Sequence, residues 1–271
     1  MEESTHVRNH SEVEQAWLAY ARSVLTDAPH IARCRALGGS PALLNGQPKP
    51  GVDDVDLRWP GYLGADAVPG KLVLIVSNVH RNFASGRVSD LDRDRLVSQT
   101  RAWRDGLAGD SEYLAAVRDV YGKGLTGGWT VSNWHLKTLK KLGVEASQIA
   151  YVNAARCQFP EPDPKLLEVE TLGGVKRDGK RTKTRLKALC LERFPMRELE
   201  QFLRPRIALF TSMEAYDQAT KGSNDPAITR LCYNQLNGNL TRPLFVDGTS
   251  MPKKTPWKVW SEFLASTGES T

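Results

Sequence analysis

Short apolar runs alternate with helical patterns along much of this chain. Apolar residues at helical spacing precede the runs at 149–152 and 206–210, and two further runs lie at 72–76 and 244–246. Helices that alternate with short strands are typical of a parallel sheet covered on both faces. The sequence therefore predicts an α/β fold, specifically a three-layer α/β/α sandwich with a short, mainly parallel central sheet.

The remaining pattern predicts one domain, residues 1–271. A capping-box pattern at Ser11 and the apolar spacing after it predict a first helix that stops before Pro29. A connector rich in Gly, Pro and Asp follows, so 1–69 is interpreted as an N-terminal helix and an irregular connector. The stretch 96–120 has a helical pattern that glycines interrupt.

Each apolar run ends in a polar or turn-forming cluster. In an open parallel sheet, ligands bind outside the carboxyl ends of the strands, so we expect these clusters to converge on one crevice. The clusters are Ser77-Asn78-Val79-His80, Asn153-Ala154-Ala155-Arg156-Cys157, Thr211-Ser212 and Asp247-Gly248-Thr249-Ser250.

The composition excludes a disordered or fibrous protein, because 40% of the residues are hydrophobic and seven are Trp. Lys and Arg outnumber Asp and Glu by 37 to 31, and this net charge of +6 is compatible with a polyanionic partner. The chain has no apolar stretch near the ~20 residues of a membrane span and no signal-peptide pattern, so we expect a cytoplasmic monomer without membrane contact. The four cysteines are too few and too scattered for a disulfide scaffold, which leaves buried thiols or metal ligands.

A dense basic run lies within residues 166–190, which we interpret as a basic insertion. Its candidate DNA-binding residues are Lys176, Arg177, Lys180 and Arg181. Two interpretations stay open: a solvated surface loop, or an arm that grips DNA phosphates and releases counterions on binding.

Residues 148–162, Gln-Ile-Ala-Tyr-Val-Asn-Ala-Ala-Arg-Cys-Gln-Phe-Pro-Glu-Pro, resemble a segment of the uracil-DNA glycosylase superfamily, particularly its iron–sulfur members. There a strand ends in Asn and is followed by a basic residue, a Cys and a Pro-rich turn. Cys190, an apolar helical face and the strand at 204–209 continue the resemblance, which covers about residues 134–215.

The resemblance implies roles for several residues around an extruded base. Asn153 matches the base-reading Asn of the family, with a residue that only terminates the strand in a turn as the alternative. Trp129 lies where the family has a stacking Phe, with a core position as the alternative. Ser250 is what remains of the final motif, whose His is absent. Met251 is a candidate wedge residue, with a surface turn as its alternative, and Lys253 and Lys254 are candidate phosphate contacts.

The segment 76–81 occupies the place of the family's first motif but has neither its Gly nor its Pro. We interpret Asn78 as the residue that positions the water and His80 as a hydrogen-bond donor to the leaving base or a phosphate, with strand capping as the alternative for His80. Ser77 is a further candidate base contact and Arg81 a candidate DNA contact.

The iron–sulfur members hold a 4Fe–4S cluster with four cysteines. Cys157 and Cys190 match two of these ligands and Cys34 a third, whereas Ile31 stands where a fourth is expected. A cluster would therefore need Cys232 as its fourth thiolate. Buried thiols without a metal are the alternative.

The leading hypothesis is a hydrolase, a monofunctional DNA glycosylase that flips a modified pyrimidine out of single- or double-stranded DNA and leaves an abasic site. The altered motifs suggest a pocket for a base other than uracil, and phage-defence enzymes that remove glucosylated hydroxymethylcytosine would fit such a pocket. A catalytically silent module that binds modified DNA is the second hypothesis, and a hydrolase of free nucleosides is the third.

Overall fold

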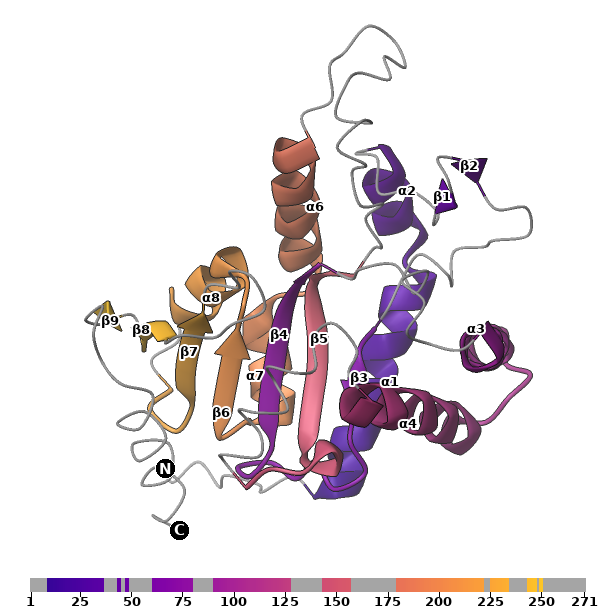
Figure 1. Ribbon diagram of the computed structural model, residues 1–271, viewed down its shortest axis with the longest axis horizontal. Coiled ribbons are helices and arrows are strands. Elements are labelled where there is room, and N and C mark those ends of the chain that lie inside the picture. Colours follow the sequence, from indigo (N-terminus) through magenta and orange to yellow (C-terminus); the bar gives the residue numbers. More distant parts are fainter. Residues whose placement is uncertain are drawn as a thin grey trace, which may run out of the picture.

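A seven-stranded sheet forms the centre of the computed structural model (Figure 1). Its strand order is β3-β5-β4-β6-β7-β8-β9, and the four strands β5, β4, β6 and β7 run parallel to one another. The structure describes residues 9–36, 43–44, 47–48, 60–79, 90–127, 143–156, 179–221, 225–233, 243–247 and 249–250. The predicted α/β fold with a mainly parallel sheet is confirmed, and the division into three layers stays a prediction.

The elements follow one another along the chain as the alternating pattern predicts. The strands are β1 (Leu43–Leu44) and β2 (Gln47–Pro48), which form a separate small sheet, then β3 (Tyr62–Leu63), β4 (Val73–Val79), β5 (Ile149–Ala155), β6 (Ile207–Phe210), β7 (Thr229–Tyr233), β8 (Pro243–Val246) and β9 (Thr249–Ser250). The helices are α1 (His10–Thr26), α2 (Ala28–Ala36), α3 (Asp90–Arg104), α4 (Asp110–Gly127), the short 3-10 helix η3 (Ala146–Gln148), α6 (Gly179–Arg193), α7 (Met196–Leu203) and α8 (Met213–Thr220).

The first helix differs from its prediction at both ends. Asn9 caps α1, because its side chain accepts a hydrogen bond from the backbone N–H of Glu12 at 3.0 Å, so the predicted cap at Ser11 was wrong. The helix does stop before Pro29, but a second helix begins there. Pro29 lies in the first turn of α2, where its missing N–H costs nothing.

Three helices cover one face of the sheet. Val152, Phe210 and Arg230 share that face, since residues paired in register alternate together along neighbouring strands. Phe210 packs edge-to-face on Tyr216 of α8, and Arg230 contacts Glu200 of α7. Helix α1 lies on the same side, packed against α7. The buried apolar residues of these elements and of the sheet form one continuous core.

The antiparallel strands at the far edge correct one prediction. β8 pairs antiparallel with β7, so its carboxyl end points in the opposite direction from the carboxyl ends of β4, β5 and β6. The turn at Asp247 joins β8 to β9 and accepts a hydrogen bond from the backbone N–H of Arg230 at 2.7 Å. Ser250 on β9 is four strands from β4, roughly 19 Å away. The 247–250 cluster therefore does not join the other polar clusters.

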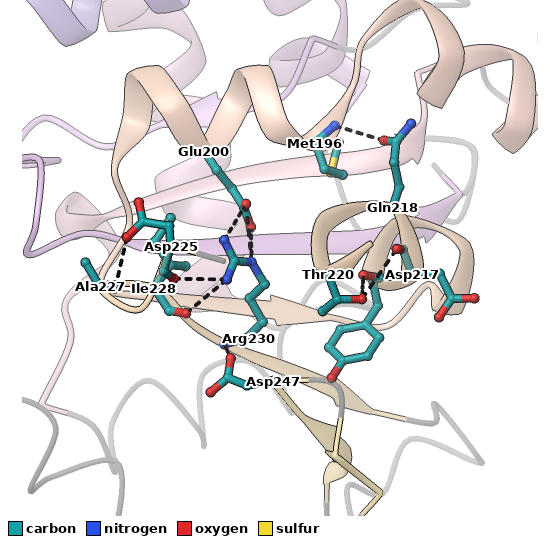
Figure 2. A network of polar contacts seen from close by, with 11 residues as sticks. Met196, Glu200, Asp217, Gln218, Thr220, Asp225, Ala227, Ile228, Arg230 and Asp247 are labelled. Atoms are coloured by element: carbon teal, nitrogen blue, oxygen red, sulfur yellow. Dashed lines mark hydrogen bonds and ion pairs between the residues drawn. The ribbon is translucent and has the colours of Figure 1, made fainter. Parts of the chain in front are cut away.

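A buried ion pair joins α7 to β7, the last of the four parallel strands along the chain (Figure 2). The guanidinium of Arg230 donates to the carboxylate of Glu200 from Nη2 at 2.9 Å and from Nε at 3.0 Å, and both side chains are at least 96% buried. Its Nη1 donates to the backbone oxygens of Asp225 and Ile228. Burial raises the pKa of the Glu200 carboxyl, and Arg230 opposes that rise.

The basic insertion is partly helical. Lys180 and Arg181 lie at the start of α6, and the end of the basic run is packed inside the molecule. Lys187 is buried and donates to Glu214 of α8 at 2.6 Å, so this lysine is not available to a phosphate. Among the described helices, none has the length and apolar character that a membrane crossing requires.

Candidate functional site

The order of the parallel strands creates a switch point between β4 and β6. The chain leaves β4 for β5 on one side and leaves β6 for β7 on the other, so the connections diverge above these two strands. Ligands of open α/β sheets bind in the crevice outside the carboxyl ends at such a point. Three predicted positions lie at these carboxyl ends: Ser77 on β4, Asn153 beside it on β5, and Thr211 directly after β6.

A relay of hydrogen bonds orients the side chain of Asn153. Tyr151 and Asn153 are two residues apart on β5 and therefore share a face, and the Tyr151 hydroxyl donates to Oδ1 of Asn153 at 3.0 Å. Ser77, the register partner of Asn153, hydrogen-bonds to the same hydroxyl. Burial raises the pKa of Tyr151 far above its ordinary value, so this hydroxyl keeps its proton and remains a donor.

The amide nitrogen of Asn153 is left without a partner among the described residues, although the side chain is only 1% exposed. Because Tyr151 holds the carbonyl oxygen, the two N–H groups are turned away from it. A buried amide donor without a hydrogen bond costs about 1 to 3 kcal/mol. The arrangement therefore favours a ligand that brings an acceptor to this position.

Thr211 offers a second hydrogen-bonding group at the same edge. Its backbone N–H extends the ladder by donating to the oxygen of Val76 at 2.9 Å, which places Thr211 next to Ser77. The buried hydroxyl of Thr211 has no partner within the described part of the chain. Ser212 is used by the fold instead: its hydroxyl caps α8 and donates to Glu214 at 2.9 Å.

Several predicted site residues are not described. Asn78 lies on β4 directly after Ser77, but only its backbone is described. The predicted residues outside the described ranges are His80, Arg81, Trp129, Cys157, Lys176, Arg177, Met251, Lys253 and Lys254.

A second cluster of chemically reactive side chains lies between α2 and α6. His30 and Cys34 are one helical turn apart on α2, and Cys190 projects from α6. Nε2 of His30 is 3.4 Å from Sγ of Cys34 and 3.6 Å from Sγ of Cys190. The donor atoms all lie within 4.8 Å of one another and all three residues are buried. This group can hold a metal ion.

The group contains two of the four predicted ligands, and Cys157, a third, lies outside the described residues. Cys34 and Cys190 come together as predicted, whereas Cys232 lies on β7 with its sulfur 4.0 Å from that of Met213. Burial raises the pKa of the Cys232 thiol to about 12. His30 was missed, although the spacing His-x3-Cys places both side chains on one helical face.

Ion pairs and a cap hold α2 against α6. Asp27 accepts a hydrogen bond from the backbone N–H of His30 at 2.9 Å and pairs with Arg193 of α6, and Arg33 pairs with Glu192 at 3.5 Å. Burial raises the pKa of Asp27, but the N–H bond and Arg193 outweigh it and hold that pKa below its ordinary value. These contacts, which need no metal, position the three donor residues.

A buried arginine directly follows Ala155, which packs with Cys34 and Cys190. Arg156, at the end of β5, is 1% exposed and donates from Nε to the Tyr20 hydroxyl at 2.5 Å. Its Nη1 and Nη2 have no partner among the described residues. Burial raises the pKa of the Tyr20 hydroxyl, and Arg156 opposes that rise.

Comparison of the chain with protein-family models, characterised proteins and solved structures gives no significant match to any of them. The resemblance to uracil-DNA glycosylases therefore stays a prediction from the sequence, and the function is argued from the site.

Proposed function

We propose that the chain is a DNA glycosylase that binds an extruded, modified pyrimidine at the switch point and hydrolyses its N-glycosidic bond. The observation that carries the proposal is the buried amide of Asn153, which Tyr151 orients and whose N–H groups lack a described partner. The position of this Asn in the motif at 148–162, and the net charge of +6, support the same function.

The chemistry of a pyrimidine explains why an amide suits this position. A base that is flipped out of DNA is recognised through hydrogen bonds to its edge, and a carbonyl oxygen on that edge accepts from an amide N–H. Negative charge grows on the base as its bond to the sugar breaks, so the same N–H strengthens its hydrogen bond in the transition state. Asn153 would then both select the base and stabilise its departure.

The groups that activate water belong to the proposal as sequence predictions. Asn78, next to Ser77 on β4, would position the water that attacks the sugar, and His80 would contact the departing base or a phosphate. Glucosylated hydroxymethylcytosine is the proposed substrate and uracil the alternative. The reason is that the motif around Asn78 and His80 differs from the motif of the uracil-DNA glycosylases that the sequence resembles.

The test incubates the protein with duplexes that contain cytosine, uracil, hydroxymethylcytosine or its glucosylated form, and scores abasic sites by alkaline cleavage. We expect product from a modified base, and a loss of about 10²- to 10³-fold in rate for Asn153→Ala, as for removal of one transition-state donor. Tyr151→Phe keeps the amide of Asn153 but removes the hydrogen bond that orients it, so a smaller loss in rate is expected. Asn9→Ser, a conservative change at the cap of α1, is the matched control. Abasic product from none of the duplexes would refute the proposed reaction.

Binding without catalysis is the second candidate. The described groups at the switch point, Ser77, Asn153 and Thr211, are neutral hydrogen-bonding side chains that bind well but transfer protons poorly. A module of this kind would retain modified DNA in a gel-shift assay without forming abasic sites, and Asn78→Ala would leave its binding unchanged.

The three described donors suit a single metal ion better than the predicted 4Fe–4S cofactor. A cube binds one thiolate per iron, so its protein ligands are roughly 6 Å apart. In this chain one of the three donors is an imidazole, and all three lie within 4.8 Å of one another. No step of the proposed reaction passes through a cluster.

A further inference from the structure

The spacing of the donors in the α2–α6 group matches the ligand shell of one ion. In a tetrahedral zinc site, bonds of about 2.3 Å to sulfur and 2.0 to 2.1 Å to nitrogen place neighbouring sulfur and nitrogen ligands about 3.6 Å apart. The two nitrogen–sulfur distances here are 3.4 and 3.6 Å. Three donors that close together belong to a single ion, because a cluster distributes its protein ligands over several irons.

We propose that His30, Cys34 and Cys190 bind one tetrahedral Zn²⁺ as a structural site, in place of the iron–sulfur cluster that the sequence resemblance implies. A mixture of imidazole and thiolate ligands is typical of zinc. The sulfurs pack with Ala155, Leu186 and Leu189 in an apolar cluster, which keeps water away from the ion. Catalytic zinc needs an accessible open position, so this buried surrounding favours a structural role.

Binding of the ion has a consequence for the charge of the group. Both thiols lose their protons on binding, and two thiolates neutralise the charge of Zn²⁺. The described residues supply three of the four ligands of a tetrahedral ion.

A zinc ion at this point would connect segments that are far apart in the chain. His30 and Cys190 are 160 residues apart in sequence, and Ala155 at the carboxyl end of β5 packs against the same cluster. Asn153 is two residues before Ala155 on that strand. The ion would therefore hold both helices against the end of the strand that carries the proposed base contact.

The experiment measures metal in the full-length protein purified under reducing conditions, by mass spectrometry for zinc and iron and by assay of acid-labile sulfide. About one zinc per chain and no sulfide are expected. The metal is then replaced by Co²⁺, whose absorption reports tetrahedral geometry and sulfur-to-cobalt charge transfer. Protein that contains several irons with matching sulfide, or reduced protein that binds neither Zn²⁺ nor Co²⁺, would overturn the proposal.

Variants assign the ligands. Cys34→Ser and Cys190→Ser are expected to lower zinc affinity more than about tenfold, whereas Cys232→Ser, at a buried cysteine outside the group, keeps a full zinc content. If serine variants fail to fold, His30→Cys remains informative: it should retain the ion and increase the charge-transfer absorption by one thiolate. A His30→Cys spectrum without that increase would exclude His30 as a ligand.

Discussion

The buried pair of Arg230 and Glu200 allows a quantitative test of the fold. In Arg230→Met the carboxyl of Glu200 stays 3% exposed but loses its counter-charge, and the cheapest response is for it to bind a proton. From an ordinary pKa of 4.5, protonation at pH 7 costs about 3.4 kcal/mol at 1.36 kcal/mol per unit. This agrees with the roughly 3 to 5 kcal/mol measured when one partner of a buried pair is removed.

The same reasoning predicts how the loss depends on pH. Protonation at pH 5 costs only about 0.7 kcal/mol, so the variant should regain about 2.7 kcal/mol relative to the wild type between pH 7 and pH 5. A remainder of about 1 kcal/mol reflects the lost hydrogen bonds to the oxygens of Asp225 and Ile228 and should not vary with pH. The sign follows because the folded variant holds a proton that the unfolded chain releases above its ordinary pKa.

Urea unfolding at both pH values measures the effect. With an m-value of about 3 kcal/mol/M, the midpoint of Arg230→Met at pH 7 should fall by more than about 1 M. The double variant Arg230→Met/Glu200→Leu removes both charges and should recover most of the loss. Arg95→Met, in the exposed pair with Asp119 at 2.7 Å, is the control and should change stability by less than about 1 kcal/mol. Equal losses at pH 5 and pH 7 would show that Glu200 does not take up a proton, and the reasoning would fail.

Two further changes test local features of the structure. Burial raises the pKa of Glu214, but hydrogen bonds, above all the one from Lys187, hold that pKa below its ordinary 4.5. Lys187→Met should therefore cost at most about 1 kcal/mol of stability after solvent screening. This loss should disappear when urea midpoints are measured below about pH 4.5, and a loss unchanged at pH 3 would contradict it. Gly61→Ala would place a methyl group 2.2 Å from the backbone oxygen of Tyr151 at a φ of +122°, and it should cost about 3 kcal/mol or more in thermal or urea unfolding. Gly70→Ala, with a φ of +77° and open space around it, is the control and should cost about 1 to 2 kcal/mol. Equal losses of stability would exclude the close approach of Gly61 to Tyr151.

The parallel strands were predictable where apolar runs are continuous, and not elsewhere. β4, β5 and β6 are buried on both faces, so almost every residue is apolar and the run stands out. β7 has the sequence Thr-Arg-Leu-Cys-Tyr, which looks half-exposed until the pairing of Arg230 with Glu200 is known. The direction of β8 depends on which strand it pairs with, and its local sequence contains no information about that.

The candidate site shows the same division. Asn153 could be identified from its motif, but the role of Tyr151 depends on the proton of its hydroxyl, which only the neighbouring strands determine. His30 was overlooked because the expected ligand was a cysteine at a neighbouring position. A spacing of four residues on one helix was the available signal, and the partner on α6 could not be predicted because 160 residues separate them.

That long separation has a consequence for the order in which the protein is made. Helix α2 leaves the ribosome early, but its docking surface on α6 is translated only after most of the chain, so the imidazole and thiol groups of α2 stay solvent-exposed until synthesis is well advanced. Closure of so long a loop is entropically expensive and therefore comes late in folding. During that interval the thiol of Cys34 is accessible to oxidants, and docking of α2 on α6 then buries it.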